Sequence, residues 1–124
     1  MKHIVTLSFL LAGIIVFGQK VDQRSLKEAN TYYDNFLYHE AIRKYELAND
    51  STTQTLRRLG NAYWKVGNIS KAKACYELVA KSAEASDKDL MNYASILREN
   101  ENYEESELWI KKVYELNAED NRAN

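Results

Sequence analysis

The fold is decided by residues 57–77, which read RRLGNAYWKVGNISKAKACYE. Apolar or small side chains lead into this stretch with the i, i+3, i+4, i+7 spacing of a helix that has one apolar face. These residues are Leu56, Leu59, Gly60 and Tyr63. Gly67 then indicates a helix end, because glycine readily adopts the left-handed conformation that terminates helices. Ala72 and Tyr76 follow with helical spacing, so the stretch predicts two helices joined by a tight turn.

The same pattern recurs along the chain. A later copy lies 34 residues further on and comprises Leu90, Tyr93, Ala94 and Leu97, then Ser106, Ile110 and Val113. An earlier copy comprises Ala29, Tyr32, Ala41, Tyr45 and Ala48. Its second helix precedes the next one by only 31 residues, so we expect the connection at residues 49–52 to be shorter by about one helical turn. A period of this size indicates an array of helix hairpins.

These residues resemble the tetratricopeptide repeat. The second copy carries the resemblance most fully, with Leu59-Gly60, Tyr63, Gly67, Ala72 and Tyr76. The first copy has Phe36 at the turn, and the third has Glu101 at the turn and Ser106 in place of the alanine. The resemblance implies an all-α, right-handed solenoid of three hairpins within residues 19–120. It places the repeats at about 22–52, 53–86 and 87–120, with a tail or the start of a linker at 121–124.

The N-terminal segment predicts export. Ile4 to Phe17 carries no charged residue and would span about 21 Å as a helix, short of the roughly 30 Å core of a bilayer. With Val16 and Gly18 before the break, residues 1–18 fit a signal peptide cleaved before Gln19. An uncleaved anchor and an interior apolar helix are the alternatives. Cleavage would place the protein in the periplasm or at the outer membrane.

Composition excludes several classes of protein. The 124 residues include no proline, four glycines and one cysteine. The shortage of turn residues argues against an all-β fold. A single cysteine forms neither an intramolecular disulfide nor a cysteine-rich zinc site. With 17 basic against 18 acidic side chains, the chain lacks the positive surplus of a nucleic-acid-binding protein.

Residues suited to catalysis are few. After signal removal His39 is the only histidine, and its His39-Glu40-Ala41-Ile42-Arg43 context has Arg43 where a zinc helix would need a second histidine. Cys75 is expected to pack as a small apolar residue. We therefore expect a protein that is not an enzyme and that has no cofactor and no metal site.

The resemblance also implies a binding groove, because in this family the first helices line a concave surface. The candidate residues carried onto this chain are Asn30, Tyr33, Arg57, Asn61, Trp64, Lys88, Met91 and Ser95. Asn30 and Asn61 are expected at the same groove position, where side-chain amides can bind an extended peptide backbone. Trp64 and Tyr33 would be anchors, and Arg57 and Lys88 would hold a carboxylate. An ordinary polar helix surface is the alternative.

A narrower resemblance concerns the order of these segments. A signal ending in Phe17-Gly18-Gln19, three repeats, and the closing run Leu116 to Ala123 look like the N-terminal part of OmpA-family envelope proteins of Bacteroidetes, some of which serve type IX secretion. The resemblance implies a scaffold that binds an envelope protein or peptide. Membrane association would arise only through a missing domain or a partner. A secreted spacer or stand-alone peptide-binding adaptor is the alternative.

The last helix has more apolar residues than one buried face requires. They are Leu108, Trp109, Ile110, Val113, Tyr114 and Leu116. Trp109 occupies the repeat position of Cys75, which should meet a following helix. We therefore expect Trp109 to be partly exposed, with a packing partner near it.

Overall fold

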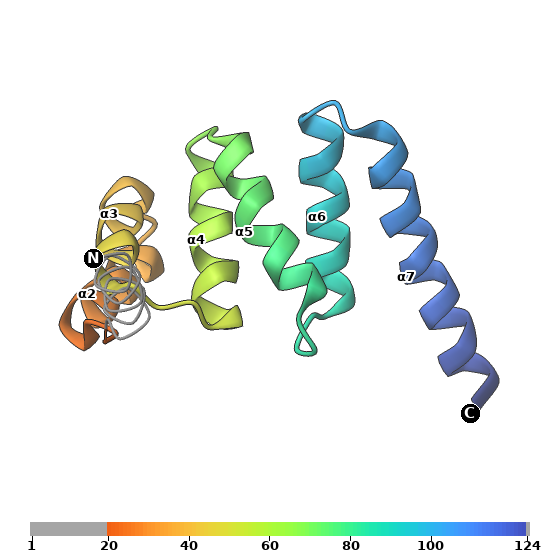
Figure 1. Ribbon diagram of the computed structural model, residues 1–124, viewed down its shortest axis with the longest axis horizontal. Helices are drawn as coiled ribbons and strands as arrows, with labels where there is room; N and C mark the ends of the chain where they lie inside the picture. Colours follow the sequence, from red (N-terminus) through yellow and green to blue (C-terminus); the bar gives the residue numbers. More distant parts are fainter. Residues whose placement is uncertain (1–19, 124) are drawn as a thin grey trace, which may run out of the picture.

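A computed structural model of the chain describes residues 20–123, and this part consists of helices, turns and short connections (Figure 1). The helices are α2 (Gln23–Asp34), α3 (Tyr38–Ala48), α4 (Thr53–Lys65), α5 (Ile69–Lys81), α6 (Asp87–Glu99) and α7 (Tyr103–Ala123). The predicted all-α fold is confirmed. The predicted signal peptide at 1–18 lies outside the described residues.

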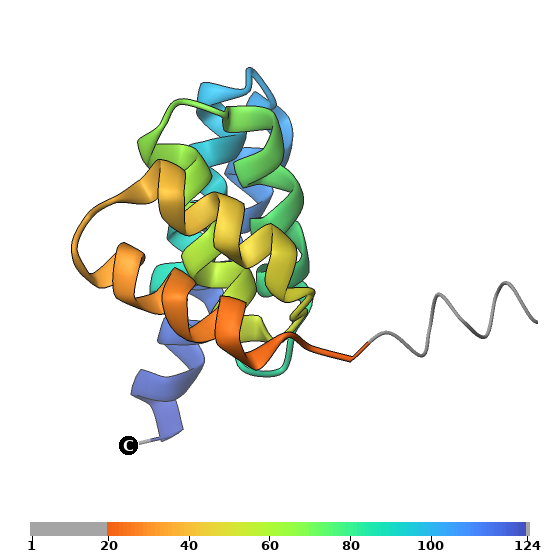
Figure 2. The ribbon, with the colours of Figure 1, turned by 90° about the vertical axis from the view of Figure 1, so that its left-hand side faces the viewer.

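The helices form three hairpins that stack in chain order. Within the hairpins α2 packs on α3, α4 on α5 and α6 on α7, while α3 packs on α4 and α5 on α6 between them. Figure 2, turned by 90°, shows the hairpins one behind another. The packing is thus between neighbours along the chain, which is the arrangement of a solenoid.

The three hairpin turns share one backbone geometry. Phe36, Gly67 and Glu101 occupy the same repeat position, with φ of 61°, 83° and 63°. In each turn the next residue donates its N–H to a carbonyl five residues back, at 2.8–2.9 Å; the donors are Leu37, Asn68 and Asn102. This pairing is the Schellman motif, which satisfies carbonyls at the end of a helix. The left-handed turn therefore forms even where no glycine is present.

The connection between the first two hairpins differs from the expectation. Residues 49–52 join α3 to α4 and residues 82–86 join α5 to α6, so the connection is shorter by one residue only. The other two residues of the shift come from α3, which has 11 residues against 13 in α5. Asn49 ends α3 early by adopting a left-handed conformation with φ of 54°.

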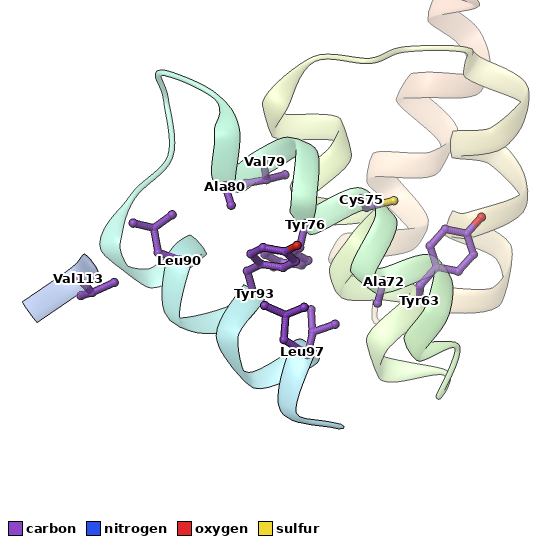
Figure 3. Close-up of a cluster of buried hydrophobic side chains, with 11 residues drawn as sticks. Tyr63, Ala72, Cys75, Tyr76, Val79, Ala80, Leu90, Tyr93, Leu97 and Val113 are labelled. Carbon is purple, nitrogen blue, oxygen red and sulfur yellow. The ribbon is translucent and has the colours of Figure 1, made fainter. Parts of the chain in front are cut away.

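The main core lies among α4, α5, α6 and α7 (Figure 3). Its largest fully buried side chains include Tyr76, Tyr93 and Leu97. A Cβ atom added to Gly60 would lie 2.8 Å from Cδ2 of Tyr76 and 3.0 Å from Cβ of Cys75. Glycine at this position therefore sets how closely α4 and α5 approach.

A smaller core joins the first hairpin to the rest. Ala29, Ala41 and Tyr45 are at most 2 % exposed and form a separate cluster between α2 and α3. Leu59 of α4 packs against both this cluster and the main core. The three hairpins therefore share apolar contacts from one end of the described chain to the other.

The last helix is longer than its counterparts. α7 has 21 residues and continues through Asn121–Ala123, where the sequence predicted a tail. No glycine or proline interrupts residues 116–123, so nothing in them terminates the helix. None of the helices described is both long and apolar enough to span a membrane.

Candidate functional site

A groove of about 300 Å³ lies along the first helices of the hairpins. Its lining comes mainly from α2, α4 and α6 and comprises Tyr33, Arg57, Arg58, Asn61, Tyr76, Ser86, Lys88, Asp89 and Asn92. Four of the eight predicted groove residues are in this set, namely Tyr33, Arg57, Asn61 and Lys88. The first helices thus bring together side chains that are up to 59 residues apart in the sequence.

Arg57 is held by a carboxylate of the protein itself. Its Nε lies 2.7 Å from Oδ1 of Asp89 and its Nη2 lies 2.8 Å from Oδ2, which makes a bidentate pair. Asp89 is 2 % exposed. The hydrogen bonds with Asp89 raise the pKa of Arg57. Because its guanidinium is already paired, Arg57 does not fit the predicted role of binding a carboxylate of a ligand.

Asp89 also organises the start of α6. The Ser86 hydroxyl accepts the N–H of Asp89, and Oδ2 of Asp89 accepts the N–H of Ser86, which completes a capping box. Burial raises the pKa of Asp89, but hydrogen bonds from Arg57 and Ser86 outweigh it and leave the pKa below its ordinary value. Asp89 is therefore a structural carboxylate that ties α4 to α6.

The two predicted asparagines lie in different hollows. Oδ1 of Asn30 accepts hydrogen bonds from Oη of Tyr45 at 2.6 Å and from Nη1 of Arg58 at 3.1 Å. Asn30 lines a neighbouring hollow with Gln23, Leu26, Asp50, Thr52, Gln54 and Thr55. Asn61 donates from Nδ2 to Oη of Tyr33 at 2.7 Å, which leaves its amide oxygen to accept a further N–H.

Three predicted residues lie outside both hollows. Trp64 packs against the main core and donates from Nε1 to Oε2 of Glu99 at 3.0 Å, so it fastens α4 to α6. Ser95 donates its hydroxyl to the carbonyl of Met91 on its own helix at 3.0 Å, and Met91 is 38 % exposed. None of the three lines the groove with Asn61.

The sequence reasoning missed Arg58 and Asn92. Arg58 lies with its guanidinium carbon 5.2 Å from the centroid of the Tyr33 ring and 3.6 Å, measured from Nη1, from Asp34. Asn92 lies 3.5 Å from Oη of Tyr76 at the other side of the groove. The family pattern counts neither residue as ligand-facing. The pair of adjacent arginines in α4 was the only sequence signal that could have indicated Arg58.

The groove is suited to binding rather than to bond-making chemistry. Its lining contains three cationic side chains against the single carboxylate of Asp89, which already neutralises Arg57. Arg58 and Lys88 are the remaining cations, and amides lie beside them. Such a surface can hold a carboxylate and an extended backbone.

Cys75 and His39 are separated by their surroundings. Cys75 is buried, as expected, and burial raises the pKa of its thiol to about 11. The thiol is therefore protonated at neutral pH and is a poor nucleophile. His39 is exposed on α3. No group of three or more metal-binding side chains occurs within residues 20–123.

Trp109 is partly exposed, as expected, although it also packs on its own chain. Its ring makes an edge contact with Tyr93, with centroids 5.3 Å apart. Nζ of Lys112 lies 4.7 Å from the centroid of Trp109. The partner predicted near Trp109 stays a prediction, because the described residues already cover much of this side chain.

Comparison with known proteins adds one match. The family model described as the tetratricopeptide repeat matches residues 54–86 and 90–120, together just over half of the chain. No curated protein matches the chain. The matched segments correspond to the second and third hairpins, and the first hairpin shares their left-handed turn geometry.

Proposed function

This chain belongs to the tetratricopeptide repeat family, and on that premise we propose that it is a non-catalytic interaction scaffold whose groove binds an extended, acidic peptide segment. Repeats of this family mediate binding of proteins or peptides. The observation that carries the proposal is the groove formed by α2, α4 and α6, where two cations that Asp89 does not neutralise lie beside amides.

The contacts suggest a role for each group. Arg58 and Lys88 would bind a carboxylate of the peptide, in place of the Arg57 and Lys88 pair that the sequence indicated. The amide oxygen of Asn61 would accept a backbone N–H, since its nitrogen is held by Tyr33. Tyr33 would support the peptide while Arg58 stacks on its ring.

The test is a comparison of peptide binding between variants inside and outside the groove. We expect an array of acidic peptides to bind the unaltered chain more tightly than neutral peptides of equal length. Asn61→Ala should weaken that binding by about tenfold, which corresponds to about 1.4 kcal/mol. Titration calorimetry of the best acidic peptide measures both affinities.

Ser95→Ala is the matched control, because Ser95 lies on a first helix but outside the groove. Its affinity should equal that of the unaltered chain. Equal affinity of Asn61→Ala and the unaltered chain, with both still helical by circular dichroism, would remove the groove assignment. A preference for neutral peptides would remove the acidic specificity.

We further infer that the scaffold works in the cell envelope, in the periplasm or at the outer membrane, as the N-terminal part of an OmpA-family protein. The support is the uncharged segment from Ile4 to Phe17 and the resemblance of the repeats and closing run to that family. The expected product of export is a chain beginning at Gln19. Mass spectrometry of the protein recovered from a fractionated envelope checks this, and an uncleaved chain in the cytoplasmic fraction would contradict it.

A further inference from the structure

α7 has a face that no other described helix covers. Repeat positions that α5 buries against α6 are held in α7 by residues 34 positions later. Tyr76 and Ala80 of α5 are 1 % and 6 % exposed, whereas their counterparts Ile110 and Tyr114 are partly exposed and 69 % exposed. The stripe formed by Ile110, Tyr114 and Ala118 is therefore positioned as if another helix packed on it.

The same helix projects from the body of the solenoid. α7 has 21 residues against 13 in α5, and the eight extra residues follow Glu115. Figure 1 shows this end of α7 running past the other helices. A helical segment without tertiary packing is only marginally stable in water, so a partner helix along the stripe would stabilise it.

Charges beside the stripe indicate what that partner is. In chain order they are Glu107, Lys111, Glu115, Glu119 and Arg122, with signs −, +, −, −, +. A second copy lying parallel would place every charge against its own sign. A second copy lying antiparallel, with the twofold axis near Tyr114 and Glu115, reverses the order and produces complementary pairs.

We propose that two copies of this chain associate through an antiparallel pairing of their α7 helices. Glu107 lies opposite Arg122 of the second copy and Lys111 lies opposite Glu119 of the second copy, and symmetry repeats both pairs. Only Glu115 meets the same residue of the second copy, close to the axis. Opposite charges are thus paired at four places and like charges at one.

The apolar stripe is compatible with the same register. Ile110 lies opposite the small Ala118 of the second copy, and the two Tyr114 rings meet at the axis, so large and small side chains alternate. The contact from residue 107 to 122 is about 22 Å long. An interface of a single helix pair lies at the small end of specific interfaces, so we expect a dimer that dissociates in the micromolar range.

Charge reversal on one helix provides the test, with the chain from Gln19 onward as the sample. Lys111→Glu places two glutamates opposite each other where Lys111 faced Glu119 of the second copy, and Glu119→Lys places two lysines there. Each single variant should raise the dimer dissociation constant at least tenfold in sedimentation equilibrium. An equimolar mixture of the two variants should dimerise again, because a dimer of one copy of each variant pairs glutamate with lysine at both places.

Asp120→Lys is the matched control. It makes the same charge change as Glu119→Lys at the adjacent residue, but at 100° per residue position 120 lies about 120° around the helix from Tyr114. Its dimerisation should equal that of the unaltered chain. Circular dichroism of each variant checks that α7 remains helical.

Three outcomes would overturn the proposal. The unaltered chain could remain monomeric at every concentration, which would leave the stripe to a different partner. Dimerisation could survive both single reversals, which would place the interface elsewhere. The mixture of variants could stay monomeric while each variant is folded, which would contradict the antiparallel register.

Discussion

Tyr76→Ala is expected to lower the free energy of unfolding by about 3–5 kcal/mol, the usual loss when a large buried aromatic ring is removed. Tyr76 is 1 % exposed, and its ring lies against the position of Gly60 between α4 and α5. It belongs to the cluster shared by α4, α5, α6 and α7. The cavity would therefore loosen two hairpins at once.

This loss is large compared with the total stability of about 5–15 kcal/mol of a small domain. Thermal unfolding followed by circular dichroism should show a Tm lower by more than about 12 °C. Tyr76→Phe is the matched control, because it keeps the ring and removes only the 3.5 Å contact with Asn92. We expect a loss of less than about 1 kcal/mol for it. Equal losses in both variants would show that the hydroxyl, not the ring, stabilises the fold.

Asp89→Ala is expected to cost about 2–3 kcal/mol at pH 7. It leaves the guanidinium of Arg57 without its bidentate partner and removes the capping box of α6. The Arg57 side chain is 35 % exposed, so the loss is smaller than the 3–5 kcal/mol typical of breaking a fully buried pair. Urea unfolding measures the loss, with Asp87→Ala, an exposed residue of the same helix turn, as the control.

The same variant predicts a pH dependence. The pKa of Asp89 is lowered in the folded protein from its ordinary value of 3.8. Its contribution to stability is therefore complete above that ordinary value and is lost as the pH falls through the lowered value. The gap in unfolding free energy between the unaltered chain and Asp89→Ala should be constant from pH 7 to pH 5 and should narrow in more acidic solution. A gap unchanged at the acidic end would contradict the role of the carboxylate charge.

The sequence by itself determined the helices, their turns and their order. Helix spacing around Gly60 and Tyr63 is read from residues within two turns of one another, and this local periodicity was sufficient to predict the hairpins. The turn positions Phe36 and Glu101 were found by their distance from Gly67, and all three have positive φ. The burial of Ala72, Cys75 and Tyr76 was also predictable, because one helix face must pack on its neighbour.

Only the tertiary structure decided which polar groups are free. Arg57 and Asp89 are 32 residues apart, and Trp64 and Glu99 are 35 apart, so their pairing depends on how α4 and α6 lie side by side. The repeat pattern assigns positions to a groove but not the rotamers or partners of the side chains there. Arg57 therefore had the right position and the wrong role, because a buried carboxylate from the next hairpin already accepts its hydrogen bonds.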